Sequence, residues 1–439
     1  MTELRTIARH AGTVLAGQLA VMAFGVTDTI VAGRYAGEAL AALSVGSAIF
    51  ISVYVALMGV VQALLPVWAE MHGSGQQAAL GRSVRQALYL CGALIALGCA
   101  ALLHPGPLLR WSGVPAALQG DVARYLSILA LAFAPALLFR LYATLNQALG
   151  KPQLVTWLQL GSVAVKVPLS IWFTFGGLGL APQGVAGCAW ATVADNLAVA
   201  LVALWLLRRQ PFYAPYRLWR RPERPSRAAM GQFLRLGVPG GLSVMVEVTA
   251  FTLMALFIAR QGTMASAAHQ IASNAAAVLY MVPLSIAIAT SARASFWLGS
   301  GEPVRARHAV ALGFRLSALM ALAFAALLFI ARRAIADVYT SQPAVAAAAA
   351  GLLSWVALYH LADAVQTLCV FVLRCWRVTA LPLAVYCVLL WGIGLRGGFV
   401  LAYGGPAWQS PSAFWAAAAA ALALTAMVFT AMVAHTVRR

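Results

Sequence analysis

The sequence predicts an all-α polytopic membrane protein with about twelve transmembrane helices in two pseudo-symmetric six-helix bundles. Hydrophobic residues make up 62% of its 439 residues and charged residues only 9%, against roughly 25% charged residues in an ordinary soluble domain. Long apolar stretches follow one another along the chain, and the sequence repeats itself weakly at a fixed interval. A transmembrane β-barrel would instead show alternating segments of ~10 residues.

Twelve apolar stretches are long enough to cross a bilayer as helices, which takes ~20 residues each. Glycine, proline, arginine or acidic residues separate them. The first stretch is span-length and carries Asp28, so we expect it to remain a helix rather than to be cleaved as a signal peptide. The spans are expected near residues 12–33, 42–66, 84–104, 125–147, 155–176, 186–207, 236–259, 268–292, 309–331, 348–373, 379–402 and 411–435.

An internal repeat divides the predicted spans into two groups of six. Shifting the sequence by 226 residues places Gly73-Ser74-Gly75 on Gly299-Ser300-Gly301, and both tripeptides follow the second helix of a half. An arginine-rich segment, 208–235, joins the two groups. We therefore predict an N-terminal half, 1–222, that ends in this linker, and a C-terminal half, 223–439. Repeats that both begin on the same side of the membrane are typical of transporters with a site near the midplane.

The formal net charge of +19 is distributed unevenly across the predicted topology. Twenty of the 30 lysines and arginines lie in loops on the side of the N-terminus, seven lie on the opposite side and three lie within spans. The positive-inside rule then predicts a multi-pass protein of the cell inner membrane with both termini cytoplasmic. Anionic lipid headgroups explain the basic loops, so we expect the bilayer as a partner and no nucleic acid. No obligatory protein partner is evident.

Enzymatic and metal-binding motifs are not evident in the sequence. The six cysteines lack the spacing of metal ligands, and neither H-E-x-x-H nor G-x-S-x-G occurs. We therefore expect no metal centre, no cofactor and no enzymatic activity.

Two carboxylates lie near the middle of spans in the C-terminal half. An ionisable group at the bilayer centre costs ~2.5–3.5 kcal/mol even on lenient insertion scales, so each is a candidate functional residue. Glu247 and Asp363 together are able to take up a proton or a small cation. The alternative is that each only hydrogen-bonds to a neighbouring helix. Tyr359, one helical turn before Asp363, is able either to meet a bound cation or to pack as an ordinary aromatic residue.

The N-terminal half also carries charged residues inside spans. Asp28 lies in the first span, Lys166 in the fifth, and Asp195 with Asn196 in the sixth. Lys166 is able to pair with Asp28 or with Asp195. Such a pair would hold the N-terminal half together or take part in function, and the sequence leaves both open. Loss of one partner of a buried pair is costly.

Three groups of segments resemble the multidrug and toxic compound extrusion family, in its NorM-like branch. They come from the first, the seventh and eighth, and the tenth spans, so the resemblance covers both halves. The segments are Gly25-Val-Thr-Asp28-Thr-Ile-Val-Ala-Gly33; Val238-Pro239 to Glu247-Val248-Thr249, Ala267-Ala-His269-Gln270-Ile and Met281-Val-Pro283-Leu-Ser285; and Tyr359-His-Leu-Ala-Asp363-Ala-Val-Gln366 with Leu373-Arg374.

This resemblance implies a secondary active antiporter that exports organic cations or amphipathic drugs in exchange for H⁺ or Na⁺. The expected coupling residues are Asp28, Glu247 and Asp363. Residues expected to line the cation site or the substrate cleft are Tyr359, Gln366, Lys166, Ser170, Thr192, Asp195 and Asn196.

Two departures from the family pattern affect these expectations. Lys166-Val-Pro168-Leu-Ser170 stands where the family often has asparagine, and a fixed ammonium beside Asp28 would compete with sodium. We therefore expect protons or a structural role there rather than a sodium site. Cys375-Trp376-Arg377 lacks a glycine that the family commonly has. The alternative function is a lipid-linked precursor flippase, which would need a basic cleft lined by residues such as Lys166 and Arg140.

Overall fold

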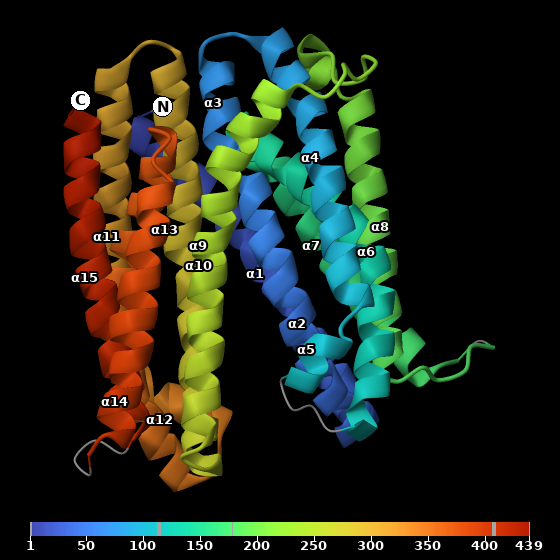
Figure 1. Ribbon diagram of the computed structural model, residues 1–439, viewed down its shortest axis with the longest axis vertical. Coiled ribbons are helices and arrows are strands. Elements are labelled where there is room, and N and C mark those ends of the chain that lie inside the picture. Colours follow the sequence, from blue (N-terminus) through green and yellow to red (C-terminus); the bar gives the residue numbers. More distant parts are fainter. Residues whose placement is uncertain (1, 112–115, 178, 406–409, 439) are drawn as a thin grey trace. The chain divides into compact units, whose positions relative to one another are not determined.

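The computed structural model describes residues 2–111, 116–177, 179–405 and 410–438 and confirms the all-α class (Figure 1). Within these ranges, helices are interrupted by short connections and by one isolated β-bridge between Gly177 and Leu180. Twelve helices of 24 to 37 residues are long and apolar enough to cross a membrane. At ~1.5 Å per residue, even the shortest exceeds the ~30 Å hydrocarbon core. The predicted number of spans is therefore confirmed.

The chain forms two compact units whose limits differ from those of the predicted halves. The N-unit is Ala16–Gly241, and the C-unit combines Met1–Leu15 with Leu242–Arg439. The first helix and the seventh long helix therefore each contribute one end to each unit. The boundary at residue 222 remains a prediction from the sequence repeat.

The N-unit contains the later part of α1 (Glu3–Tyr35), the early part of α9 (Arg227–Ala259) and the helices between them. Its helix α6 packs against α2, α4 and α8, and α7 also packs against α8. The elements between α1 and α9 are α2 (Gly37–Gln62), α3 (Leu65–Gly73), α4 (Gln77–Leu103), α5 (Gly106–Trp111), α6 (Ala116–Ala148), α7 (Pro152–Phe175), α8 (Val185–Arg209) and the 3₁₀-helix η1 (Pro211–Tyr216).

The C-unit is built around α12, which packs against α10, α11 and α15. The N- and C-terminal ends of the chain lie at the same end of this unit's helices (Figure 1). Its elements after α9 are α10 (Thr263–Gly299), α11 (Pro303–Tyr339), α12 (Pro343–Cys375), α13 (Ala380–Tyr386), the π-helix η2 (Cys387–Arg396), α14 (Gly397–Tyr403) and α15 (Pro411–Arg438). Helices α13, η2 and α14 together form one span, Ala380–Tyr403.

Most helices extend beyond the predicted spans at their basic ends. Helix α1 begins at Glu3 and α9 begins at Arg227, so several arginines expected in loops are helical. Hydropathy detects only the part of a helix that lies in hydrocarbon, whereas backbone hydrogen bonding continues into the headgroup region. The linker outside α-helices is accordingly shorter than predicted, and part of it forms η1.

The two aligned Gly-Ser-Gly tripeptides have the same backbone conformation. Gly75 has φ of 71° and Gly301 has φ of 73°. The residue after each glycine donates its N–H to the carbonyl five residues earlier, at 3.0 Å for Gln76 and 2.9 Å for Glu302. Both are Schellman-type helix ends, which require a left-handed residue that glycine adopts without strain. The repeat is therefore visible in local structure as well as in sequence.

Arg377 adopts a left-handed conformation, with φ of 63°, just after α12. Gly150 ends α6 in the same way, with φ of 68°. A residue with a Cβ is disfavoured in this region by ~1–2 kcal/mol. The departure from the family pattern at Cys375-Trp376-Arg377 therefore places a strained residue where glycine fits without strain.

The arginine-rich linker is docked on α4 of the N-unit. The buried guanidinium of Arg85 donates from Nε to Oε2 of Glu223 at 3.0 Å, and from Nη2 to the other carboxylate oxygen. Its Nη1 donates to the carbonyl of Arg217 at 2.7 Å. The next residue, Gln86, accepts a hydrogen bond from the N–H of Ser226 at 2.8 Å. The linker is thus held by directed hydrogen bonds along one helix.

We expect Arg85→Ala to release the linker from α4, so that its backbone becomes more mobile and limited cleavage by trypsin after the exposed Arg220 becomes faster. The hydrogen bond from Arg85 lowers the pKa of Glu223 from 4.5 to about 2. The pKa of Glu223 is lower in the folded protein than in the unfolded chain. The contact therefore stabilises the folded protein fully above pH of about 4.5, and this stabilisation is lost as the pH falls toward about 2. The control is Arg82→Ala, since Arg82 is 71% exposed and lies 3.9 Å from Glu223. Equal cleavage rates for both variants would contradict this role of Arg85.

Candidate functional site

Two carboxylates lie close to each other inside the C-unit. Glu247 comes from α9, and Asp363, which is 3% exposed, comes from the central helix α12. The charged and polar neighbours of Glu247 are Asp363, Arg374 and Gln366. The two acids expected from the sequence to act together are therefore electrostatic neighbours.

Hydrogen bonds fix the side chain of Asp363. Gln366 donates from Nε2 to Oδ1 of Asp363 at 2.8 Å, and the hydroxyl of Thr367 donates to the same oxygen at 3.5 Å. The hydroxyl of Tyr386 donates to Oε1 of Gln366. Because an amide has one acceptor end, this bond from Tyr386 turns the donor end of Gln366 toward Asp363. Gln366, a predicted lining residue, thus contacts the carboxylate directly.

Three residues near this pair were not among the predicted site residues. Tyr280 on α10 and Tyr386 on α13 are neighbours of both carboxylates, and Arg374 on α12 is a neighbour of Glu247. In the described part of the chain, no ion pair within 4.0 Å joins Arg374 to a carboxylate. With both acids ionised, the cluster carries two negative charges and one positive charge. One additional proton or monovalent cation would neutralise it.

A π-helix begins directly after Tyr386. The segment Cys387–Arg396 continues the helical path of α13 with wider turns. Such turns are rare and are frequently found at functional sites, because they change the direction of neighbouring side chains. Here the change in helix type falls next to the tyrosine that orients Gln366.

Tyr359 packs against other aromatic residues. Its ring lies edge-on to Phe251, with centroids 5.7 Å apart, and to Trp415, with centroids 5.8 Å apart. Phe251 and Trp415 also contact each other edge-on at 6.0 Å. The structure thus places Tyr359 in an aromatic cluster one turn from Asp363. Its predicted contact with a cation remains a prediction.

Lys166 pairs with Asp28 in the N-unit. The ammonium, on a side chain that is 1% exposed, lies 3.0 Å from Oδ1 of Asp28. It also donates to the carbonyl of Cys188 at 3.1 Å and to the hydroxyl of Thr192. Ser170 donates its hydroxyl to the same Asp28 oxygen at 3.0 Å. Of the two pairings considered from the sequence, the structure contains the one with Asp28.

Asp195 lies next to this pair without sharing its hydrogen bonds. Its side chain is 2% exposed, and its Oδ1 has no hydrogen-bond partner among the described residues. Lys166 and Asp28 are its charged neighbours. Asn196 is only partly buried, and no contact described here joins it to the cluster. The structure thus brings together four of the predicted N-terminal residues and places Asp195 beside them.

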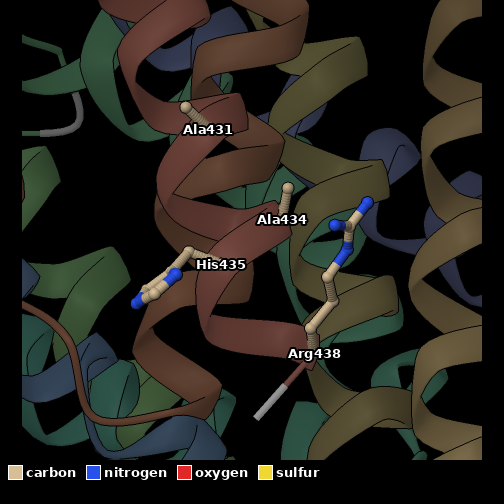
Figure 2. A pocket seen from close by; sticks show the side chains of 4 residues that line it. All are labelled: Ala431, Ala434, His435 and Arg438. Atoms are coloured by element: carbon tan, nitrogen blue, oxygen red, sulfur yellow. The ribbon is translucent and has the colours of Figure 1, made fainter.

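One hollow of the described chain lies near its C-terminal end, away from the carboxylates. A cavity of about 460 Å³ is lined by Ala431, Ala434, His435 and Arg438 near the end of α15. Figure 2 shows that His435 and Arg438 extend to opposite sides of this helix. No group of three metal-binding side chains occurs within the described ranges. The candidate site is the pair of Glu247 and Asp363 with its polar neighbours.

Known proteins place the chain in a family. A family model described as MatE matches residues 14–172 and 239–400. This chain belongs to the MatE family. This MatE chain is 36% identical over 433 residues to a probable multidrug resistance protein NorM of Aromatoleum aromaticum, and the match covers 98% of this chain and 94% of that protein. It is 32% identical over 400 residues to the multidrug resistance protein PmpM of Pseudomonas aeruginosa, covering 91% of this chain and 84% of that protein.

Solved structures share the fold of this MatE chain. The eukaryotic MATE transporter AtDTX14 matches with a TM-score of 0.89 and 18% identity, covering 99% of this chain and 97% of that one. The Vibrio cholerae MATE transporter VcmN in its bent form matches with a TM-score of 0.86 and 18% identity, covering 99% and 97%. The family resemblance predicted from the sequence is thereby confirmed. The chain is a multi-pass membrane transporter and not an enzyme.

Proposed function

We propose that this chain is a secondary active antiporter of the cell inner membrane that exports organic cations or amphipathic drugs in exchange for H⁺ or Na⁺ by alternating access. Relatives named multidrug resistance proteins support the substrate class. The observation that carries the proposal is the pair of Glu247, which is partly buried, and Asp363, which is buried, in the C-unit. Such groups are expensive inside a membrane and typically mark ion or proton pathways.

Coupling follows from the charge of this pair. With Arg374 nearby, the ionised cluster has one negative charge in excess, so it has room for one proton or one monovalent cation. A bound ion changes the equilibrium between two conformations only if it binds one of them more tightly. The inward-moving ion then favours one state, and the export substrate binds the other or displaces the ion. Two carboxylates in a low-dielectric site also attract cationic substrates.

The proposed orientation has both termini in the cytoplasm. Twenty of the 30 lysines and arginines lie on that side in the assigned topology. The two ends of the chain lie at one end of the C-unit, as this orientation requires (Figure 1). In a cell with an inner membrane, the basic side faces the cytoplasm.

Transport by the purified protein in liposomes tests the proposal. A pH gradient and a sodium gradient are imposed in turn, and the efflux of a fluorescent organic cation is followed. We expect one gradient to drive efflux above the rate of protein-free liposomes, and the effective gradient identifies the coupling ion. Failure of both gradients with every cation tested contradicts the antiporter.

The flippase alternative predicts a different result in the same liposomes. It requires basic residues that are free to hold a phosphate, yet Lys166 is engaged by Asp28, Cys188 and Thr192. Gradient-independent movement of a fluorescent lipid-linked phosphate across the liposome membrane, without cation efflux, would favour the flippase.

A further inference from the structure

The ammonium of Lys166 occupies a cage made of oxygen atoms. A carboxylate oxygen of Asp28, the carbonyl of Cys188 and the hydroxyl of Thr192 surround it. Carboxylate, carbonyl and hydroxyl oxygens are also the donors that hard metal cations prefer. The ammonium is therefore a positive charge fixed to the chain, and the oxygen atoms around it could otherwise bind a metal cation such as sodium.

All hydrogen-bonding capacity of this ammonium is in use. A lysine ammonium has three donors, and each of the three oxygen atoms around Lys166 accepts one. Oδ1 of Asp28 in turn accepts from Lys166 and from Ser170, each at 3.0 Å. The ammonium of Lys166 therefore has no hydrogen left to donate to Asp195.

Asp195 is the member of the cluster whose hydrogen bonds are incomplete. Its Oδ1 is buried, without a hydrogen-bond partner in the described chain, and its charged neighbours are Lys166 and Asp28. With all three groups ionised, the cluster carries one negative charge in excess, as the cluster around Glu247 does in the C-unit. A buried unpaired carboxylate is strongly disfavoured unless a positive charge neutralises it.

We infer that Asp195 is the proton-binding residue of the N-unit, and that Lys166 acts as a permanent internal cation that excludes sodium from Asp28. This inference rests on the proposed antiport and assigns its ion chemistry within one unit. The sequence had placed the coupling role on Asp28. The hydrogen bonds around Asp28 transfer that role to Asp195.

A proton fits Asp195 better than a metal cation for geometric reasons. Hard metal cations are held by several oxygen ligands at once, whereas the oxygens around Asp28 are already occupied by Lys166. A proton needs only the one free carboxylate oxygen. Two further titratable groups, Cys188 on α8 and Tyr125 on α6, are electrostatic neighbours of Asp28. Neither carries a charge that would replace the proton.

Infrared difference spectroscopy of the purified full-length protein tests the proton site. Spectra recorded between alkaline and acidic pH report the carbonyl stretch of carboxyl groups that become protonated. We expect Asp195→Asn to remove one component of this band, because the amide keeps the shape of the side chain but cannot titrate. The control is Asp337→Asn, an exposed residue of α11 that should leave the buried components unchanged. An unchanged band in Asp195→Asn, or loss of the same component in Asp28→Asn instead, overturns the assignment.

Sodium-dependent thermal stability tests the role of Lys166. Lys166→Asn empties the ammonium position and adds an amide oxygen, so we expect NaCl to raise Tm more than choline chloride does, by a margin absent from the wild type. The double variant Asp28→Asn/Lys166→Asn should lose this gain. No sodium-dependent gain in the folded Lys166→Asn protein overturns the exclusion of sodium by Lys166. Neither measurement uses transport, so a failed efflux assay refutes the proposed function and leaves these two results to decide the inference.

Discussion

Asp363→Asn is expected to lower gradient-driven efflux to the rate of protein-free liposomes. The asparagine oxygen still accepts the hydrogen bonds that Gln366 and Thr367 donate to Asp363. The cluster with Glu247 and Arg374, however, becomes neutral without an added ion, so it no longer distinguishes the ion-loaded from the empty transporter. Efflux of a fluorescent organic cation from liposomes, under the gradient that drives the wild type, measures the effect.

The matched control for this variant is Asp337→Asn. Asp337 lies exposed on α11, so its substitution removes the same charge without touching the pair of Glu247 and Asp363. We expect its efflux rate to equal that of the wild type. Size-exclusion profiles and thermal unfolding should show that both variants are folded. Full efflux by a folded Asp363→Asn protein would falsify the coupling role of Asp363.

Lys166→Met is expected to destabilise the protein by about 3–5 kcal/mol, because it leaves a buried carboxylate without its partner. Asp28→Asn should also destabilise it, since the ammonium, on a side chain that is 1% exposed, then loses the carboxylate that lies 3.0 Å away. The double variant Asp28→Asn/Lys166→Met leaves neither charge behind. It should therefore be more stable than either single variant.

The coupling energy of this pair comes from a double-mutant cycle. Unfolding of the four proteins in mixed micelles gives each change in the free energy of unfolding, and contacting residues are expected to be non-additive by roughly 0.5–3 kcal/mol. If the two single effects simply add in the double variant, the contact between Lys166 and Asp28 does not stabilise the N-unit. In that case the ammonium would serve only to exclude sodium from Asp28 and would not stabilise the fold.

The number of spans and their helical class could be predicted because hydrocarbon thickness imposes a length on every apolar stretch. The limits of the helices could not. Arg227 and Glu3 begin helices α9 and α1, although nothing apolar marks these positions. The wide turns of η2 were equally invisible, since an apolar run of span length looks the same whether its hydrogen bonds skip four residues or five.

Most charged members of the candidate site could be predicted, and the family resemblance implied polar partners such as Gln366, whereas Arg374, Tyr280 and Tyr386 were missed. A carboxylate or ammonium in an apolar span is conspicuous, which is why Glu247, Asp363 and Lys166 were identified. Tyr280 and Tyr386 are single aromatic residues in apolar helices, and only packing between helices brings them to the acids. The choice of Asp28 over Asp195 as the partner of Lys166 also depends on helix packing, which one sequence does not contain.

Helices α1 and α9 each have one end in the N-unit and the other end in the C-unit, and this affects what a cut in the linker would do. Residues Ile7 and Ala11 of α1 belong to a hydrophobic cluster of the C-unit, while Asp28 of the same helix is bound to Lys166 in the N-unit. Helix α9 likewise begins in the N-unit, where Gly241 approaches Val60 of α2. A break in the peptide chain at the linker would leave each fragment with a helix end embedded in the other unit. Each unit would then be completed by a helix end from the other polypeptide.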